Sequence, residues 1–172
     1  HKNNFVYEDF FNLVKEVKNS AAFSQAEINK YLDTEQAKEV IENLDLSPLN
    51  GEGGFFRFLH EFGEHSGSIY YLVTDESFSH LHALTDDELW FFLEGDEAEQ
   101  TIIYEDGRIE KRVLNKENRE SLVIKNAFQA TRIKNSICGY SLFSTVMSPK
   151  YRDDMYISGK DDEKMRSMKE VE

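Results

Sequence analysis

The sequence predicts a mainly β domain that follows two or three helices. From residue 67 to residue 147, short apolar runs alternate with turn signals at roughly regular spacing, which is typical of a β-sandwich or barrel. Before Pro48, apolar residues instead recur at helical spacing. The 172 residues include 13 Phe and 8 Tyr, and aromatic side chains favour strands.

Three segments at the start of the chain have helical patterns. Residues 5–19 place four apolar side chains on one helical face, namely Phe10, Leu13, Val14 and Val17. Residues 24–33 follow, with Ser24 and Glu27 at the spacing of a capping box. Residues 33–46, capped by Asp33 or Thr34, have the clearest pattern, an apolar stripe of Ala37, Val40, Ile41 and Leu44. Pro48 and the glycine-rich turn of residues 49–56 then end the helical part.

Eight runs after this turn have strand character. They cover residues 67–74, 79–84, 88–95, 99–107, 109–114, 120–126, 130–135 and 139–147. Asp106-Gly107 is typical of a hairpin bend. Residues 59–68 are polar and loop-like, so we expect His60 and His65 on the surface. The predicted organisation is a helical extension (1–33), a β-barrel domain (34–165) and a charged tail (166–172), the barrel having an interior that can hold a ligand.

Charge and composition narrow the classes of partner. The net charge is −13, which argues against nucleic acid and against an anionic membrane surface. Cys138 is the only cysteine, so neither an intrachain disulfide nor a thiolate metal cluster can form. No apolar run approaches the length of a membrane helix, and no signal-peptide pattern is present. We therefore expect a cytoplasmic protein whose partner is a small molecule.

The stretch of residues 78–96 carries the candidate site. Residues two apart in a strand point to the same face, so His80 and His82 are expected to point together. Glu88 follows across a short bend and can return on the neighbouring strand. Two imidazoles and a carboxylate from adjacent strands are suitable for zinc, iron, manganese or nickel. The alternatives are an acid–base site without metal and a strand pair that merely carries histidines.

Four motifs occur in the order found in one known family. They are "LDLSPLNGEGGFFR" at 44–57, "IYYLVT" at 69–74, Ser79 and His82 followed by "DELW" before Gly95, and "SPKYRDDMYISGKDDE" at 148–163. On these motifs the chain resembles the cupin superfamily over about residues 34–165. Within it, the chain is most similar to the cupin-5 family, also called DUF985.

The resemblance implies a cupin double-stranded β-helix, a jelly-roll barrel with its pocket inside. It also implies one divalent transition metal held by His80, His82, Glu88 and a fourth ligand. By order and spacing the fourth position falls at Gln129, where cupins normally have histidine. An amide oxygen is a poorer ligand for transition metals than imidazole.

Each candidate residue has a functional and a structural interpretation. His82 is a candidate metal ligand or general acid–base group, or else a hydrogen-bonded core histidine. Glu88 is a ligand, an orienting acceptor for His82, or part of an ion pair. Tyr70 and Tyr71 alternate faces, and Tyr70 is our catalytic candidate with His82 and Glu88. The ligand-binding candidates are Glu52, Phe56, Arg57, Trp90 and Gln129. The structural alternatives for this group are a glycine turn at Glu52, an ion pair at Arg57 and core packing of the aromatic side chains.

Three classes of function remain open from the sequence. One is an epimerase- or isomerase-type enzyme that acts on a sugar-like or keto acid metabolite. Another is a non-catalytic ligand-binding or sensing module, and the third is a seed-storage-like or purely structural cupin dimer. Exposed strand edges of such barrels often pair across a twofold axis, so we also expect a homodimer.

Overall fold

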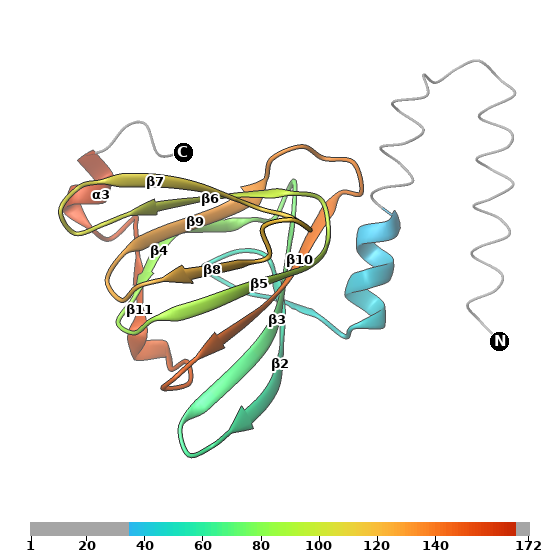
Figure 1. The fold of residues 1–172 in the computed structure, drawn as a ribbon, viewed down its shortest axis with the longest axis horizontal. Coiled ribbons are helices and arrows are strands. Elements are labelled where there is room, and N and C mark those ends of the chain that lie inside the picture. Colours follow the sequence, from blue (N-terminus) through green and yellow to red (C-terminus); the bar gives the residue numbers. More distant parts are fainter. Residues whose placement is uncertain (1–34, 168–172) are drawn as a thin grey trace, which may run out of the picture.

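The computed structural model describes residues 35–167, so the helices predicted at 5–19 and 24–33 lie outside the described residues. Figure 1 shows two antiparallel sheets that face each other, with a helix over residues 35–43 against one of them. The six-stranded sheet has the order β1-β2-β3-β10-β5-β8, and the five-stranded sheet has the order β11-β4-β9-β6-β7.

The strands of the six-stranded sheet are β1 (Ser47–Pro48), β2 (Phe55–Phe62), β3 (Ser66–Thr74), β5 (Glu88–Gly95), β8 (Glu120–Val123) and β10 (Tyr140–Met147). Those of the other sheet are β4 (Ser79–Leu84), β6 (Ala98–Ile103), β7 (Ile109–Leu114), β9 (Phe128–Ile133) and β11 (Tyr156–Ser158). A 3-10 helix, η1 (Asp153–Met155), precedes β11, and α3 (Glu163–Ser167) ends the described part. Because β10 lies between β3 and β5 while β9 lies between β4 and β6, the chain winds as a jelly roll.

The main core fills the space between the two sheets. Its largest members are Tyr71, Trp90 and Phe143, whose rings meet edge to face. A second apolar cluster lies outside the six-stranded sheet, where the helix at 35–43 covers Leu72 and Leu142. Strand β3 is therefore covered on both faces at this end. Tyr71 belongs to the main core, whereas Tyr70 packs against the outer cluster.

The eight predicted strand runs are all found, but the loop predicted at residues 59–68 is wrong. Strand β2 runs through Phe62 and pairs with β3 along its length. Its neighbour β1 contacts only Phe55 and Phe56, so the outer half of β2 is exposed and has no alternation of apolar and polar residues. The predicted bend at Gly107 is confirmed, since the Gly107 amide donates to the Tyr104 carbonyl in the β6–β7 hairpin.

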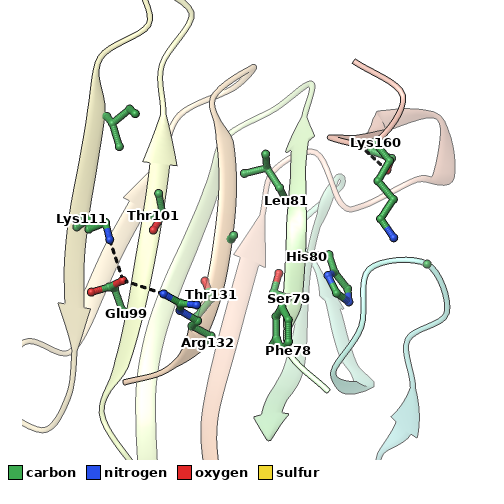
Figure 2. A pocket seen from close by; sticks show the side chains of 14 residues that line it. Phe78, Ser79, His80, Leu81, Glu99, Thr101, Lys111, Thr131, Arg132 and Lys160 are labelled. Atoms are coloured by element: carbon green, nitrogen blue, oxygen red, sulfur yellow. Dashed lines mark hydrogen bonds and ion pairs between the residues drawn. The ribbon is translucent and has the colours of Figure 1, made fainter. Parts of the chain in front are cut away.

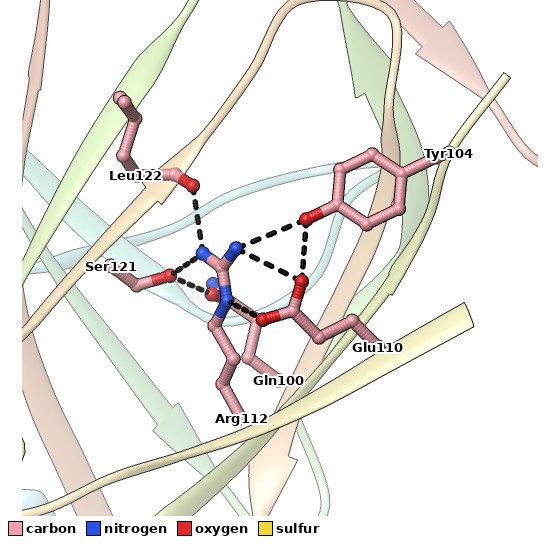
Figure 3. A network of polar contacts seen from close by, with 6 residues as sticks. All are labelled: Gln100, Tyr104, Glu110, Arg112, Ser121 and Leu122. Atoms are coloured by element: carbon pink, nitrogen blue, oxygen red, sulfur yellow. Dashed lines mark hydrogen bonds and ion pairs between the residues drawn. The ribbon is translucent and has the colours of Figure 1, made fainter. Parts of the chain in front are cut away.

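A polar network joins the edge strands β7 and β8, which belong to different sheets (Figure 3). Arg112 on β7 donates to Ser121 Oγ and the Leu122 carbonyl on β8, both at 2.7 Å, and to Glu110 Oε1 at 2.7 Å. Ser121 in turn donates to buried Gln100 at 2.6 Å. The hydrogen bonds from Arg112 hold the pKa of Glu110 at about 2, below its usual range. The network closes this side of the barrel.

Replacement of Arg112 by methionine should lower the free energy of unfolding by about 2 kcal/mol, because it removes charged hydrogen bonds and leaves a backbone carbonyl unpaired. Lys111→Met, on the same strand, is the matched control, since Lys111 is 60% exposed and its ion pair with Glu99 is 3.3 Å long. Urea unfolding measures both variants. Equal losses would show that the network adds nothing beyond an exposed ion pair.

The outer face of the six-stranded sheet is covered only in part. Phe91 and Leu93 on β5 and Leu122 on the neighbouring strand β8 are exposed apolar side chains. Such exposed apolar side chains are compatible with the homodimer predicted from the sequence, which stays a prediction. Among the described residues, no helix is long and apolar enough to cross a membrane.

Candidate functional site

A cavity of about 370 Å³ opens between the sheets beside β2, β3 and β5. Its polar lining includes Glu52, His82, Glu88, Thr145, Tyr151 and Asp153, and its aromatic walls include Phe56, Phe58, Tyr71 and Trp90. Five of the predicted site residues are thus brought together: Glu52, Phe56, His82, Glu88 and Trp90. A sixth, Gln129, lies directly behind them.

Glu52 reaches the cavity because its loop packs against β3 and β4. Its carbonyl accepts the His80 amide at 2.8 Å, and the Gly53 carbonyl accepts the Tyr71 hydroxyl at 2.7 Å. Gly53 has φ +92°, and a Cβ there would lie 2.2 Å from the Phe78 carbonyl oxygen. The glycines therefore allow a close approach to neighbouring strands, which is how the loop directs Glu52 inward.

His82 is held in one tautomer. It is 1% exposed, and its Nδ1 lies 2.8 Å from the His80 carbonyl, which can only accept. In the neutral imidazole Nδ1 therefore carries the proton, and the lone pair is on Nε2, which lies 3.6 Å from Glu52 Oε1. The imidazole also stacks on Tyr156, with ring centroids 5.3 Å apart. This arrangement directs the basic nitrogen at Glu52 and not at the backbone.

The electrostatics of the cavity raise the pKa of Glu52. Burial raises its pKa, the negative charge of Glu88 adds to this effect, and His82 and the 3.2 Å hydrogen bond from Ser79 oppose it. Burial, reinforced by the charge of Glu52, also raises the pKa of Tyr71 well above its ordinary value. Tyr71 therefore stays protonated and serves as a hydrogen-bond donor that anchors the loop.

Glu88 is held by two donors from buried side chains. Its Oε2 accepts Trp90 Nε1 at 3.0 Å and Gln129 Nε2 at 2.8 Å. Gln129 lies on β9 directly opposite His82 on β4, and its Oε1 is buried without a hydrogen-bond partner. The amide of Gln129 thus orients Glu88, and its oxygen is the one unsatisfied acceptor behind the site among the described side chains.

His80 does not join the site, contrary to the expectation that both histidines point inward. The β4–β9 register shifts between Ser79 and His82, so β4 carries a bulge. Ser79 and His82 are both buried, whereas His80 is exposed. His80 instead lines a hollow of about 530 Å³ on the outer face of the five-stranded sheet, together with Lys111, Arg132 and Lys160 (Figure 2).

Tyr70 and Arg57 also lie outside the cavity. Tyr70 packs against the cluster under the helix at 35–43, and Arg57 lies over its ring at 5.5 Å. Tyr71 is the tyrosine that lines the interior. The catalytic role predicted for Tyr70 therefore has no support from its position, and Arg57 has no route to a ligand in this cavity.

Sequence reasoning missed three contributors to the site. Ser79, entirely buried, donates to Glu52, and Tyr151 and Asp153 line the cavity from the segment before β11. Burial raises the pKa of Tyr151 to about 12. Ser79 and the "SPKYRDD" segment were visible as motifs, but their convergence on Glu52 depends on how the loops pack.

A family model described as "Cupin superfamily (DUF985)" matches residues 38–156. The chain belongs to this cupin family. Among solved structures, this cupin is similar to a Shewanella oneidensis protein with 28% identity and a TM-score of 0.65, over 71% of this chain and 83% of that one. A hypothetical protein from Leishmania major has 24% identity and a TM-score of 0.63, over 70% and 85% of the two chains. No curated protein matches the sequence.

Bacillus subtilis oxalate decarboxylase, whose Mn(II) centres have been characterised, shares the cupin fold. The identity is 14% and the TM-score 0.54, over 67% of this chain and 30% of that enzyme. The present cupin thus spans under a third of the decarboxylase. At this identity the likeness shows the fold alone.

The residues of this cupin pocket do not fit a transition-metal centre. It contains one imidazole, because His80 lies outside, and Glu88 Oε2 is already bonded to two N–H donors. Within residues 35–167, no group of three or more His, Cys, Asp or Glu side chains could hold a metal ion. The predicted ligand set of His80, His82, Glu88 and Gln129 is not assembled.

Proposed function

We propose that this cupin binds a small polar molecule between its sheets and moves a proton on it, as an isomerase or epimerase does. The observation that carries the proposal is the pairing of His82 Nε2 with Glu52 Oε1 at 3.6 Å inside the cavity. This distance is longer than a direct hydrogen bond. Catalytic groups are often this far apart in the free protein and move closer when a substrate binds. The reaction uses these side chains and involves no metal step.

The two groups are suited to opposite roles. His82 has its Nδ1 proton fixed by the His80 carbonyl, so Nε2 is the atom that accepts a proton from the substrate. Glu52, whose pKa is raised by burial, is the group that donates one. When the substrate gives a proton to Nε2 and takes one from Glu52 at another atom, it is isomerised without net gain or loss of protons.

The surrounding residues hold this pair in place. Ser79 donates to Glu52, Tyr71 fixes the Gly53 carbonyl beside it, and Tyr156 stacks on the His82 ring. Trp90 and Gln129 hold Glu88 by hydrogen bonds. Such support keeps reacting groups in a fixed geometry, which is the main requirement of acid–base catalysis by a small pocket.

Exchange of carbon-bound hydrogen tests the proposal. Polar metabolites that raise the melting temperature are incubated with the protein in D₂O, and ¹H NMR follows the loss of carbon-bound protons. We expect at least one bound compound to incorporate deuterium, because a substrate proton held on His82 exchanges with solvent. Ligands that bind without any exchange or isomerisation would favour the non-catalytic ligand-binding module instead.

A further inference from the structure

Three carboxyl groups line the cavity, and no Lys or Arg is among its lining residues. Glu52 is the proton donor of the proposed function, which leaves Glu88 and Asp153 as the negative groups. The basic side chains Lys111, Arg132 and Lys160 lie around the hollow on the outer face of the five-stranded sheet (Figure 2). An anionic ligand inside would therefore meet the negative charge of Glu88 and Asp153, with no Lys or Arg side chain to offset it.

Four hydrogen-bond donors in or directly behind the cavity walls are already used within the protein. Tyr71 donates to the Gly53 carbonyl, Trp90 and Gln129 donate to Glu88, and Ser79 donates to Glu52. What remains for a ligand is the carboxyl oxygens, the aromatic surface and the uncharged side chains of Asn50, Ser68 and Thr145. Carboxyl oxygens accept hydrogen bonds from a ligand that brings its own donors, and carboxylates attract one with a positive charge.

The aromatic walls complement the carboxyl groups. Phe56, Phe58, Tyr71, Trp90 and Tyr151 all line the cavity. The negative faces of such rings attract organic cations, most strongly where water is excluded. The volume of about 370 Å³ lies in the range of small-molecule sites.

We propose that the ligand of this cavity is a small organic cation, a protonated amine or a quaternary ammonium compound. The proposal rests on the proposed function for its site and narrows the substrate class. A keto acid, which the sequence left open, is excluded by the carboxyl groups that line the walls. A sugar-like substrate is retained only if it carries an amino group.

Choline and 3,3-dimethylbutan-1-ol test the inference, because they have nearly the same shape and differ in charge. Isothermal titration calorimetry of the full chain should show choline binding at least about tenfold more tightly than the neutral alcohol, and pyruvate not binding. Equal affinity for choline and the alcohol, or tighter binding of pyruvate, would overturn the proposal.

Two variants locate the effect in the cavity. Glu88→Gln removes a charge from the cavity wall and should reduce the preference for choline over the neutral alcohol several-fold. If Glu88→Gln does not fold, Asp153→Asn serves instead, since it removes a charge from a segment outside the sheets. Asp106→Asn, in the exposed β6–β7 turn, is the control and should leave the preference unchanged. If both cavity variants keep the full preference for choline over the neutral alcohol, choline does not bind at the assigned site.

The outcomes separate this inference from the proposed function. Deuterium exchange into an anionic metabolite would refute the proposal of a cationic ligand and would support the acid–base function of the cavity. Tight choline binding, with no exchange into any amine tested, would support the cation site and refute catalysis.

Discussion

Gly53→Ala is expected to destabilise the protein by more than about 3 kcal/mol, whereas Gly51→Ala costs about 1 kcal/mol. The two glycines belong to the same loop and have nearly equal φ values, +92° and +89°. A Cβ at Gly53 would lie 2.2 Å from the Phe78 carbonyl oxygen, while one at Gly51 would meet nothing within 4 Å. Strain from positive φ is common to both variants. The difference between their free energies of unfolding therefore measures how closely the loop packs against Phe78, the residue before β4.

Chemical denaturation gives both free energies of unfolding. If the loop escapes the clash by moving, Glu52 moves with it, so Gly53→Ala should also weaken binding of cavity ligands. Similar stability and similar ligand binding in the two alanine variants would mean that the loop is not packed as described.

His82→Gln should slow deuterium exchange into a bound substrate by about 10²- to 10⁴-fold, the usual contribution of a general base. Glutamine keeps a polar side chain of similar size but cannot accept a proton at neutral pH. Binding of the ligand should persist, since the carboxyl and aromatic groups of the cavity are unchanged. ¹H NMR in D₂O measures the rate, and the ligand-induced shift in melting temperature measures binding.

His80→Gln is the matched control for this variant. His80 is two residues away in the same strand but faces the outer hollow, so its replacement should leave the exchange rate unchanged. Comparable losses in the two variants would indicate that both imidazoles act together, as the sequence pattern alone suggested, and would contradict the bulged geometry of β4.

Most of the barrel could be predicted from the sequence because its strands alternate between core and solvent. The run at 88–95 is an example, since Glu88, Trp90 and Phe92 are buried and Phe91 is exposed. Strand β2 was not predicted because no residue in it is fully buried, so it lacks the alternation of core and solvent positions. The motifs identified the family correctly, and with it the jelly-roll architecture.

The candidate site was harder to predict where tertiary contacts override local periodicity. A bulge in β4 turned His80 outward, and a two-residue period contains no sign of a bulge. The helix at 35–43 covers the outer face of β3, so β3 has apolar residues on both faces and its sequence pattern did not show that Tyr71, and not Tyr70, faces the interior. Glu52 joins His82 only through contacts between its glycine loop and distant strands.

The central claim is that Glu52 and His82 form an acid–base pair that needs no metal. The rate of deuterium exchange into a bound substrate, measured before and after exhaustive treatment with a chelator, tests it most directly. The account predicts the same rate in both samples, with metal analysis confirming that the treated protein is metal-free. A rate that is lost on chelation and restored by manganese, iron, zinc or nickel would contradict it.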